Sequence, residues 1–576
     1  MINSLIAFIK SGLKEISPLH NIKSLNTNIR ADILAGITVA IITLPLALAF
    51  GVMSGLGPAA GVWGAIVGGI VGGLFGGCMV GVSGPTAPKA AQIALFIGGG
   101  AVISTTPELD LGAAFSIIFL SGLILVVVSM LRISHFIHYT PYSVVAGFMS
   151  GIGVIVILTQ INAFIGLPAQ QDIMGVFKNL KSSIQNIKID ALYVSIPSLL
   201  ILFLWPLLER KNKILEKIPA PLVALIVGTS IAFCMDSKIP YIGDQMGELK
   251  SEVFSFYIPN LYRFFDFIGP ALALAALAIL DSLLSCIVAD NMTGKRHSSD
   301  RETFGQGMAN MAAGLFGGVT TATATMRTVA NIKFGGKTPL ASIVHGLTLL
   351  AILLGLSSFV AAIPKACLAA ILFKVGIDIL DYRILPVLRK LPIAELVIFA
   401  IVLFVTVYAD LMVAVAIGVT FACLKYFKEI KLTLKSDYCH KIIPLSQANF
   451  SFKEQVKHKV FNLPVSVLKL EGPLFFGTIE SLKKTYSKAL NHEILIIDMS
   501  HVTTVDLSGA YALEDIIRGI KTDNVKIFVL NPNSRTRRIL ERFDFIVNIG
   551  KDHYKESEKS IIYAILKHYQ LEQDIS

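Results

Sequence analysis

The fold of this chain is decided by two interrupted apolar stretches, which open on Gly81-Val-Ser-Gly-Pro-Thr-Ala-Pro88 and on Val319-Thr-Thr-Ala-Thr-Ala-Thr325. Both openings are poor in helix-forming residues, so neither can belong to a full-length helix that faces lipid. The same tetrapeptide precedes both stretches, as Leu74-Phe-Gly-Gly77 and as Leu315-Phe-Gly-Gly318. Its recurrence before a short, broken span in each half of the chain indicates a membrane protein built from inverted repeats.

The composition agrees with a membrane protein. Of the 576 residues, 54% are hydrophobic and 15% are charged, whereas about 25% are charged in a typical soluble domain. One large water-soluble globule is therefore excluded. About fourteen apolar segments precede residue 429, most of them near the length that crosses a bilayer. They cover residues 32–51, 60–78, 86–99, 112–131, 143–165, 191–208, 220–235, 266–289, 305–317, 324–333, 341–362, 365–380, 392–409 and 411–427.

The positive charges predict the orientation of these segments. Basic residues follow the even-numbered segments, for example Arg132, Arg210, Lys295, Arg383 and Lys425. Cytoplasmic loops carry such an excess of Lys and Arg, so we expect both termini in the cytoplasm and the protein in the inner or plasma membrane. The net charge of +11 is then explained by the loops, and no nucleic-acid partner is predicted.

Other kinds of site find little support in the sequence. Gly335-Gly-Lys-Thr338 resembles the end of a phosphate-binding loop, but Asn331 stands where that pattern needs Gly. The six cysteines form no CxxC pair, so neither a disulfide framework nor a structural zinc site is predicted. No nucleophile and base, and no metal-spaced set, suggest an enzyme. We therefore expect no cofactor other than Na⁺ as a coupling ion.

Helices that start in mid-membrane leave their first N–H groups unpaired and carry partial positive charge there. Two such ends that face each other would bind a small anion. Residues at these ends should be small and hydroxylated, as Ser83, Thr86, Thr323 and Thr325 are. The alternative is that these residues only serve helix packing in the membrane.

Ionisable residues within the spans are costly and usually functional. Asp281 lies one helical turn before Ser285, and a carboxylate with a hydroxyl on one helix face suits Na⁺, while a carboxylate alone could carry H⁺. A buried structural ion pair is the alternative. Arg327 can add positive charge to the end that begins near Thr325, or pair with Asp281. Lys89 faces the site or extends its ammonium towards the membrane surface.

These residues resemble the sulfate permease (SulP) family of anion transporters. The motifs that carry the resemblance are Asp32-Ile-Leu-Ala-Gly-Ile-Thr-Val-Ala40, Leu44-Pro-Leu-Ala-Leu-Ala-Phe-Gly51, Ser83-Gly-Pro-Thr86, Asp290-Asn-Met-Thr-Gly-Lys-Arg-His297, Gln306-Gly-Met-Ala-Asn310 and Arg327-Thr-Val-Ala-Asn-Ile332. The resemblance implies an all-α polytopic fold of fourteen spans in a seven-plus-seven inverted repeat, as in uracil permeases. It also implies a core domain (spans 1–4 and 8–11) that moves as an elevator against a gate domain, and a homodimer.

Within the family, the motifs are most similar to the sodium-dependent bicarbonate transporters. That likeness implies Na⁺ ligands at Asp281, Ser285 and the backbone near Thr323 and Thr325, and anion contacts at Thr86, Ala324 and Thr325, to which Ser83 and Arg327 are added here. Arg327 and Lys89 depart from that branch and favour a more highly charged anion. We therefore expect a secondary transporter for sulfate or a similar anion, coupled to Na⁺ or H⁺. A sodium-dependent bicarbonate symporter is the alternative, and a membrane-tethered regulatory sensor is the alternative from another class.

The last part of the chain is more highly charged than the rest and predicts a separate α/β domain. The expected divisions are a cytoplasmic N-terminus at 1–31, a membrane domain at 32–428, a linker at 429–463 and a soluble domain at 464–576. Strands are predicted at 465–470, 494–498 and 525–530, and helices at 479–489, 508–520 and 534–543. The run from Asp498 to Ala510 resembles the STAS domain, in whose bacterial relatives a Ser like Ser508 is phosphorylated. We expect Ser508 to be a helix N-cap instead.

Overall fold

The computed structural model divides the chain into two compact units. One holds Met1–Ile137, Met149–Leu380 and Val405–Met412, and the other holds His138–Phe148, Asp381–Phe404 and Val413–Ser576. The structure describes residues 18–98, 111–132, 134, 142–168, 170, 173–209, 211, 215, 218–246, 256–293, 295–355, 360–380, 392–408, 417, 420–421, 441–448, 463–474, 493–521, 525–530, 533–542, 545–546, 550 and 553–569.

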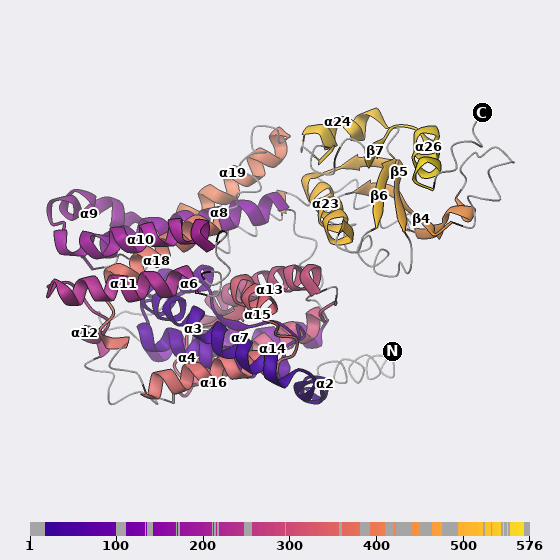
Figure 1. The fold of residues 1–576 in the computed structure, drawn as a ribbon. Coiled ribbons are helices and arrows are strands. Elements are labelled where there is room, and N and C mark those ends of the chain that lie inside the picture. The colour runs from indigo at the N-terminus through magenta and orange to yellow at the C-terminus, as the bar shows by residue number, and fades with distance from the viewer. Residues whose placement is uncertain are drawn as a thin grey trace. The chain divides into compact units, whose positions relative to one another are not determined.

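The first unit is helical (Figure 1). Its main helices are α3 (Ile29–Met53), α4 (Pro58–Val67), α6 (Ala87–Gly98), α7 (Leu111–Met130), α9 (Ile173–Gln185), α10 (Ile189–Glu209), α11 (Ala220–Cys234), α13 (Phe264–Thr293), α14 (Ser299–Leu315), α15 (Thr325–Lys333), α16 (Leu340–Gly355) and α18 (Lys365–Ile379). Helices α8 (Tyr142–Phe164) and α19 (Ile393–Tyr408) begin in the second unit and end in the first. Among the described residues, six helices are long and apolar enough to cross a membrane, and shorter apolar helices lie between them.

Glycines allow the helices of the first unit to pack closely. Helices α13 and α14 lie against α7, and α16 lies against α3. A side chain at Gly122 of α7 would place its Cβ 2.4 Å from the main-chain N of Met311, and one at Gly61 would reach 1.9 Å from the carbonyl of Ala47. Small residues at such contacts let backbones approach, which is how helices associate where lipid removes the usual hydrophobic driving force.

The two interrupted stretches meet inside this unit. Residues Ser83–Pro85 form strand β1, Thr321–Thr323 form strand β2, and the two strands pair antiparallel. Each strand leads directly into a short helix, β1 into α6 and β2 into α15. The predicted breaks are therefore present, and each pairs with the corresponding break in the other half of the chain.

The second unit contains a five-stranded sheet in the order β3-β4-β5-β6-β7. Strands β4 (Val465–Leu474), β5 (Ile494–Val505), β6 (Lys526–Leu530) and β7 (Tyr554–Lys555) are parallel, and β3 (Lys441–Pro444) is antiparallel to β4. Helices α23 (Leu507–Lys521), α24 (Ser534–Arg542) and α26 (Glu558–His568) complete it, and the hydroxyl of Tyr569 donates to Glu493 Oε2 at 3.0 Å. The predicted α/β domain is confirmed, but its sheet begins with β3, inside the segment 429–463 that was predicted to be a linker.

Several details differ from the sequence-based expectations. Helix α14 begins at Ser299, six residues before the predicted 305, because its first turns are polar and fall outside an apolar window. The amphipathic helix α9 was not predicted. Ser508 is not the N-cap of α23, since the helix begins at Leu507 and the carboxylate of Asp506 accepts from the N–H of Gly509 at 2.7 Å. The predicted helix at 479–489 and most of the predicted span at 411–427 lie outside the described residues.

Candidate functional site

The candidate site is built on the strand pair at the start of α6 and α15. Ser83 lies opposite Thr323 in the register, and their hydroxyl oxygens are 3.2 Å apart. The N–H of Ala324 donates to the carbonyl of Val82 at 3.1 Å, which fixes the start of α15 to the chain that leads into β1. The two helix starts therefore share one frame of main-chain hydrogen bonds.

The buried carboxylate of Glu302 on α14 forms hydrogen bonds to the segments that contain both strands. Oε2 of Glu302 accepts from the N–H groups of Gly77 and Cys78 at 2.8 and 2.9 Å, and Oε1 accepts from the hydroxyl of Thr323. One turn further along α14, Nε2 of Gln306 lies 2.9 Å from Glu302, 2.7 Å from Ser83 and 2.9 Å from Thr323. Ser83 and Thr323 are thus engaged in a polar network, and each is almost completely buried.

Asn310 holds the other end of β2 in the same way. Its Oδ1 accepts from the N–H of Thr321 at 2.7 Å and from the hydroxyl of Thr320 at 2.5 Å, and its Nδ2 donates to the carbonyl of Thr321 at 2.9 Å. A three-residue strand has few hydrogen bonds of its own, so side chains at i, i+4 and i+8 of one helix supply the rest.

The start of α15 is open. Its N-cap is Ala324, which has no side chain that could accept from the first N–H groups, and alanine is among the poorest N-cap residues. Thr325 is exposed, and Met326 is 61% exposed. Within the described part of the chain, no N-cap side chain accepts from the first N–H groups of α15, so these groups and their partial positive charge suit an anion site.

The start of α6 is similar but enclosed. Thr86 precedes the helix, is 7% exposed, and its hydroxyl has no hydrogen-bond partner among the described residues. The hydroxyl acts on Asp281 of α13 from farther than a hydrogen bond. Ser285, one turn along α13, donates to the carbonyl of Asp281 at 2.8 Å, and its hydroxyl lies 2.8 Å from that of Thr325. Helix α13 thus connects the starts of both short helices.

Two buried positive side chains, Arg327 and Lys89, lie near the strand pair. Arg327 is 2% exposed, and its Nη2 donates to the carbonyl of Pro85 at 2.8 Å. Lys89 is completely buried, and its ammonium has no hydrogen-bond partner among the described residues. Both interact electrostatically with the partly buried Asp281. His345 of α16, whose Nε2 lies 2.8 Å from the hydroxyl of Thr43, also interacts electrostatically with Arg327.

The predicted site residues therefore fall into three groups. Ser83 and Thr323 belong to the buried network of Glu302; Ala324, Thr325 and Ser285 line the open start of α15; Thr86, Asp281 and Arg327 lie on the enclosed side with Lys89. Glu302, Gln306 and Asn310 were not predicted as site residues. A Glu and a Gln one turn apart beside an apolar segment are the signal that could have found them.

The stretch that resembles a phosphate-binding loop binds a carboxylate of the chain itself. The N–H of Lys337 and the hydroxyl of Thr338 donate to Asp32 at the start of α3, at 2.8 and 2.5 Å. Asp32 is fully buried. This turn thus fastens α3 to the segment before α16.

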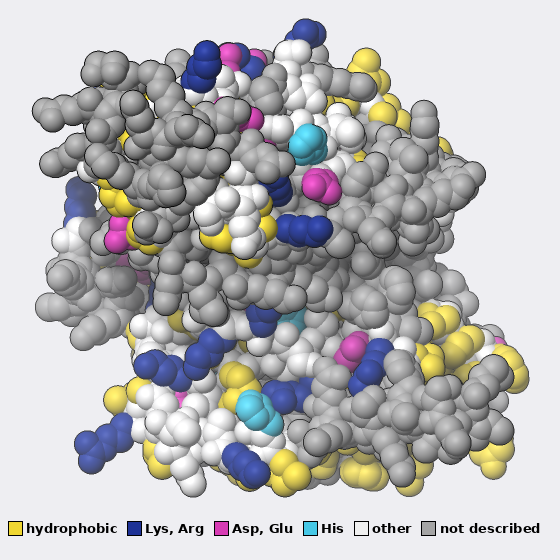
Figure 2. Space-filling view, turned by 90° about the vertical axis from the view of Figure 1, so that its right-hand side faces the viewer, with side chains coloured by type: hydrophobic (Ala, Val, Ile, Leu, Met, Phe, Trp, Pro, Cys, Tyr) yellow, Lys and Arg dark blue, Asp and Glu magenta, His cyan; other side chains and the backbone are white. Residues whose placement is uncertain are grey.

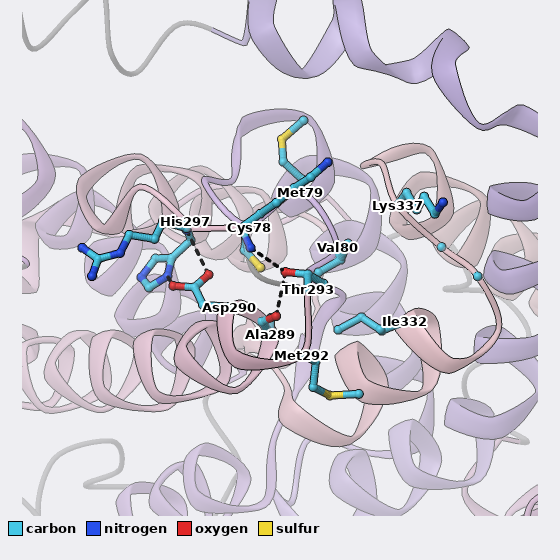
Figure 3. A pocket seen from close by; sticks show the side chains of 14 residues that line it. Cys78, Met79, Val80, Ala289, Asp290, Met292, Thr293, His297, Ile332 and Lys337 are labelled. Atoms are coloured by element: carbon cyan, nitrogen blue, oxygen red, sulfur yellow. Dashed lines mark hydrogen bonds and ion pairs between the residues drawn. The ribbon is translucent and has the colours of Figure 1, made fainter. Parts of the chain in front are cut away.

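A separate pocket, with a cavity volume of about 370 Å³, lies where α13 and α15 end (Figure 3). Nδ1 of His297 lies 2.7 Å from Asp290 Oδ2. The lining residues are 78–80, 289–290, 292–293, 295–297, 332 and 335–337. Lys337 and His297 stand on opposite sides of it in Figure 3. None of the predicted anion ligands is among the described residues that line this pocket.

Lys and Arg side chains gather on the lower half of the face that Figure 2 shows.

Comparisons with known proteins place the chain in a family. Residues 29–402 match the model of the "Sulfate permease family", and residues 457–559 match that of the "STAS domain". The bicarbonate transporter BicA of Picosynechococcus sp. is 32% identical over 555 residues, which cover 94% of this chain and 96% of the relative. Sulfate transporter 4.1 of Arabidopsis thaliana is 23% identical over 513 residues, covering 84% of this chain and 73% of that protein.

Among solved structures, the transmembrane domain of a cyanobacterial bicarbonate transporter BicA is similar with a TM-score of 0.61 and 34% identity. The similarity covers 67% of this chain and 97% of that domain. These relatives are transporters and not enzymes. The match of well over half of the chain shows that this integral membrane protein belongs to the sulfate permease family of anion transporters and carries a STAS domain.

Proposed function

We propose that this protein is a secondary transporter for a small inorganic oxyanion, which binds at the open start of α15 beside the strand pair. The observation that carries the proposal is the uncapped helix start at Ala324 and Thr325, fixed to β1 by main-chain hydrogen bonds. A small anion can accept from the free N–H groups and from the hydroxyl of Thr325 without a dedicated cluster of charged ligands.

Bicarbonate is the substrate that we favour. The similarity to BicA extends over nearly the whole of both chains. In addition, the guanidinium of Arg327 contacts the carbonyl of Pro85 and is buried, so its position does not add a second direct ligand to the open helix start. A monovalent anion is the better match for a site made of helix N-termini and hydroxyls.

Sulfate is the second candidate, for a specific reason. Lys89 and Arg327 place two positive charges behind the strand pair, against one negative charge on Asp281. Their summed field favours a divalent anion more than a monovalent one, because the energy scales with the charge of the anion. Competition between the two anions for one uptake activity decides between them.

Transport is proposed to occur by an elevator motion of the helices that carry the site. Helices α3, α4, α6, α7 and α13–α16 pack on one another, and β1 and β2 tie both short helices into this group. Moving them together would carry the bound anion without breaking the frame. Fourteen spans, two cytoplasmic termini and a homodimer complete the proposed architecture.

Asp281 is the proposed coupling residue. Its side chain interacts with Thr86 at the start of α6 and electrostatically with Arg327 of α15, and an unbalanced charge within the membrane is costly. A cation must therefore balance Asp281 in every state that crosses the membrane, and that cation is either taken up from solution or is a positive side chain of the protein. Na⁺ and H⁺ are the soluble cations that a symporter would use.

The test is uptake of labelled bicarbonate and of labelled sulfate into proteoliposomes that contain the full chain. Each anion is offered with an inward Na⁺ gradient, with an inward H⁺ gradient and with neither. Uptake above empty liposomes under at least one condition supports the proposal. If neither anion enters under any condition, anion transport is refuted, and a membrane-tethered regulatory sensor becomes the better account.

Two variants test the assigned roles. Thr325→Ala removes a hydroxyl at the open helix start and should raise the apparent KM by about fivefold, the worth of one hydrogen bond of about 1 kcal/mol. Asp281→Asn should lower kcat instead, because the buried positive charges lose their negative partner. The same change in KM and kcat from both variants would contradict this division of roles.

A further inference from the structure

Lys89 is the least expected side chain in the membrane unit. It is the third residue of α6, it is 0% exposed, and its ammonium has no hydrogen-bond partner among the described residues. Lysines are almost never fully buried unless they are paired, because an isolated ammonium is poorly solvated by protein. A function that uses the charge itself would explain why the residue is there.

The charge that Lys89 faces is Asp281. Helix α6 packs against α13, and the two side chains interact electrostatically. Oδ2 of Asp281 also lacks a hydrogen-bond partner among the described residues. The ammonium of Lys89 and the carboxylate of Asp281 are therefore opposite charges on neighbouring helices, with no hydrogen bond between them.

Arg327 also interacts electrostatically with Asp281, but its guanidinium is hydrogen-bonded elsewhere. Its guanidinium donates to the carbonyl of Pro85, and it packs so closely on β1 that a Cβ at Gly84 would lie 2.0 Å from Nη1. Arg327 is thus fixed to the strand, where it supports the helix starts. His345 interacts electrostatically with Arg327, and its Nε2 is hydrogen-bonded to the hydroxyl of Thr43.

We propose that Lys89 is a tethered counter-cation for Asp281, so that this protein transports its anion without Na⁺. This inference rests on the proposed transport function and specifies its coupling. An ammonium and a sodium ion carry the same unit charge, and a lysine on α6 travels with the moving helices. A second cation beside Asp281 would be repelled by the charge of Lys89 in a medium of low dielectric constant.

The first experiment compares uptake by the full chain in Na⁺ and in N-methylglucamine, for the wild type and for Lys89→Met, whose side chain has a similar length and no charge. Wild-type uptake should be the same in both cations. Lys89→Met should lose about tenfold or more without Na⁺ and recover most of it with Na⁺. Lys333→Met, which removes an exposed lysine from the end of α15, is the matched control and should behave as the wild type.

Two results in this assay would overturn the inference. One is a requirement of the wild type for Na⁺, and the other is full activity of Lys89→Met without Na⁺.

A second measurement does not depend on transport. The melting temperature of the detergent-solubilised wild type is compared in NaCl and KCl of equal concentration. Equal melting temperatures support the proposal that Lys89 already fills the cation site beside Asp281, whereas a higher melting temperature in NaCl than in KCl refutes it. Because only the wild type is measured, this test holds even if Lys89→Met fails to fold. A wild type that shows no uptake at all but equal melting temperatures would refute the proposed transport function and leave the assignment of Lys89 supported.

Discussion

Replacing Glu302 by Ala should destabilise the membrane unit more than any surface change. The side chain is 1% exposed, and its two oxygens accept from four donors. Two of these donors are the main-chain N–H groups of Gly77 and Cys78, which precede β1, and a third is the hydroxyl of Thr323 in β2. One carboxylate therefore ties together the two breaks on which the site is built.

The expected loss follows from these bonds. Hydrogen bonds to a charged group contribute about 1.5–3 kcal/mol each, and a buried donor left without an acceptor costs a similar amount. The bonds from Gly77 and Cys78 alone give a loss of about 3–6 kcal/mol for Glu302→Ala. Glu302→Gln keeps one carbonyl oxygen and the shape of the side chain, so it should lose about half as much.

Thermal or denaturant unfolding of the purified protein in detergent measures these losses. Asp266→Asn is the matched control, since Asp266 forms an exposed ion pair with Arg263 at 3.3 Å, and such pairs contribute about 0–1 kcal/mol. The expected order of stability is Asp266→Asn, then Glu302→Gln, then Glu302→Ala. If Glu302→Ala unfolds like Asp266→Asn, the carboxylate does not hold the frame and the reasoning is wrong.

Three further predictions concern other parts of the chain. Gly84→Ala should lower transport but keep the fold, because its Cβ must displace the guanidinium of Arg327 from the carbonyl of Pro85. Gly269→Ala, which meets no atom within 4 Å, should leave uptake unchanged, and equal activity of both variants would contradict the role of Arg327. Burial and a hydrogen-bonded carboxylate raise the pKa of Tyr569 to about 12 from 10.0, so its stabilising contribution is full below pH 10 and is lost towards pH 12. The difference in unfolding free energy between wild type and Tyr569→Phe should therefore be constant below pH 10 and shrink above it, and a flat difference would refute this. Removal of residues 437–576 should lower activity or assembly, while the ratio of bicarbonate to sulfate uptake stays the same; a changed ratio would place part of the selectivity in the tail.

The sequence predicts the long helices well because their signal is local. The predicted segment at 112–131 corresponds to α7 at Leu111–Met130, and the one at 266–289 to α13 at Phe264–Thr293. A run of apolar residues long enough to cross a bilayer has few alternatives to a helix. The starts of the two short helices were also predicted closely, because glycine, proline and threonine interrupt the apolar pattern at those points.

The pairing of the two breaks could not be predicted in the same way. Strands β1 and β2 have three residues each and lie far apart in the chain, so no periodicity marks them and no turn sets their register. Glu302 was not predicted as a site residue because it lies in the polar first turns of α14, outside the apolar segments. What makes Glu302 important is the two N–H groups that it satisfies, and these come from a distant segment.

An inverted repeat suggests two equivalent helix starts, but the side chains make them different. Thr325 is exposed beside an alanine N-cap, whereas Thr86 is buried next to Asp281 and Lys89. In the proposed mechanism, the anion therefore approaches the α15 start, and the enclosed α6 start holds the charges that do not exchange with solution. This division allows one half of the repeat to select the substrate while the other fixes the charge that travels with it.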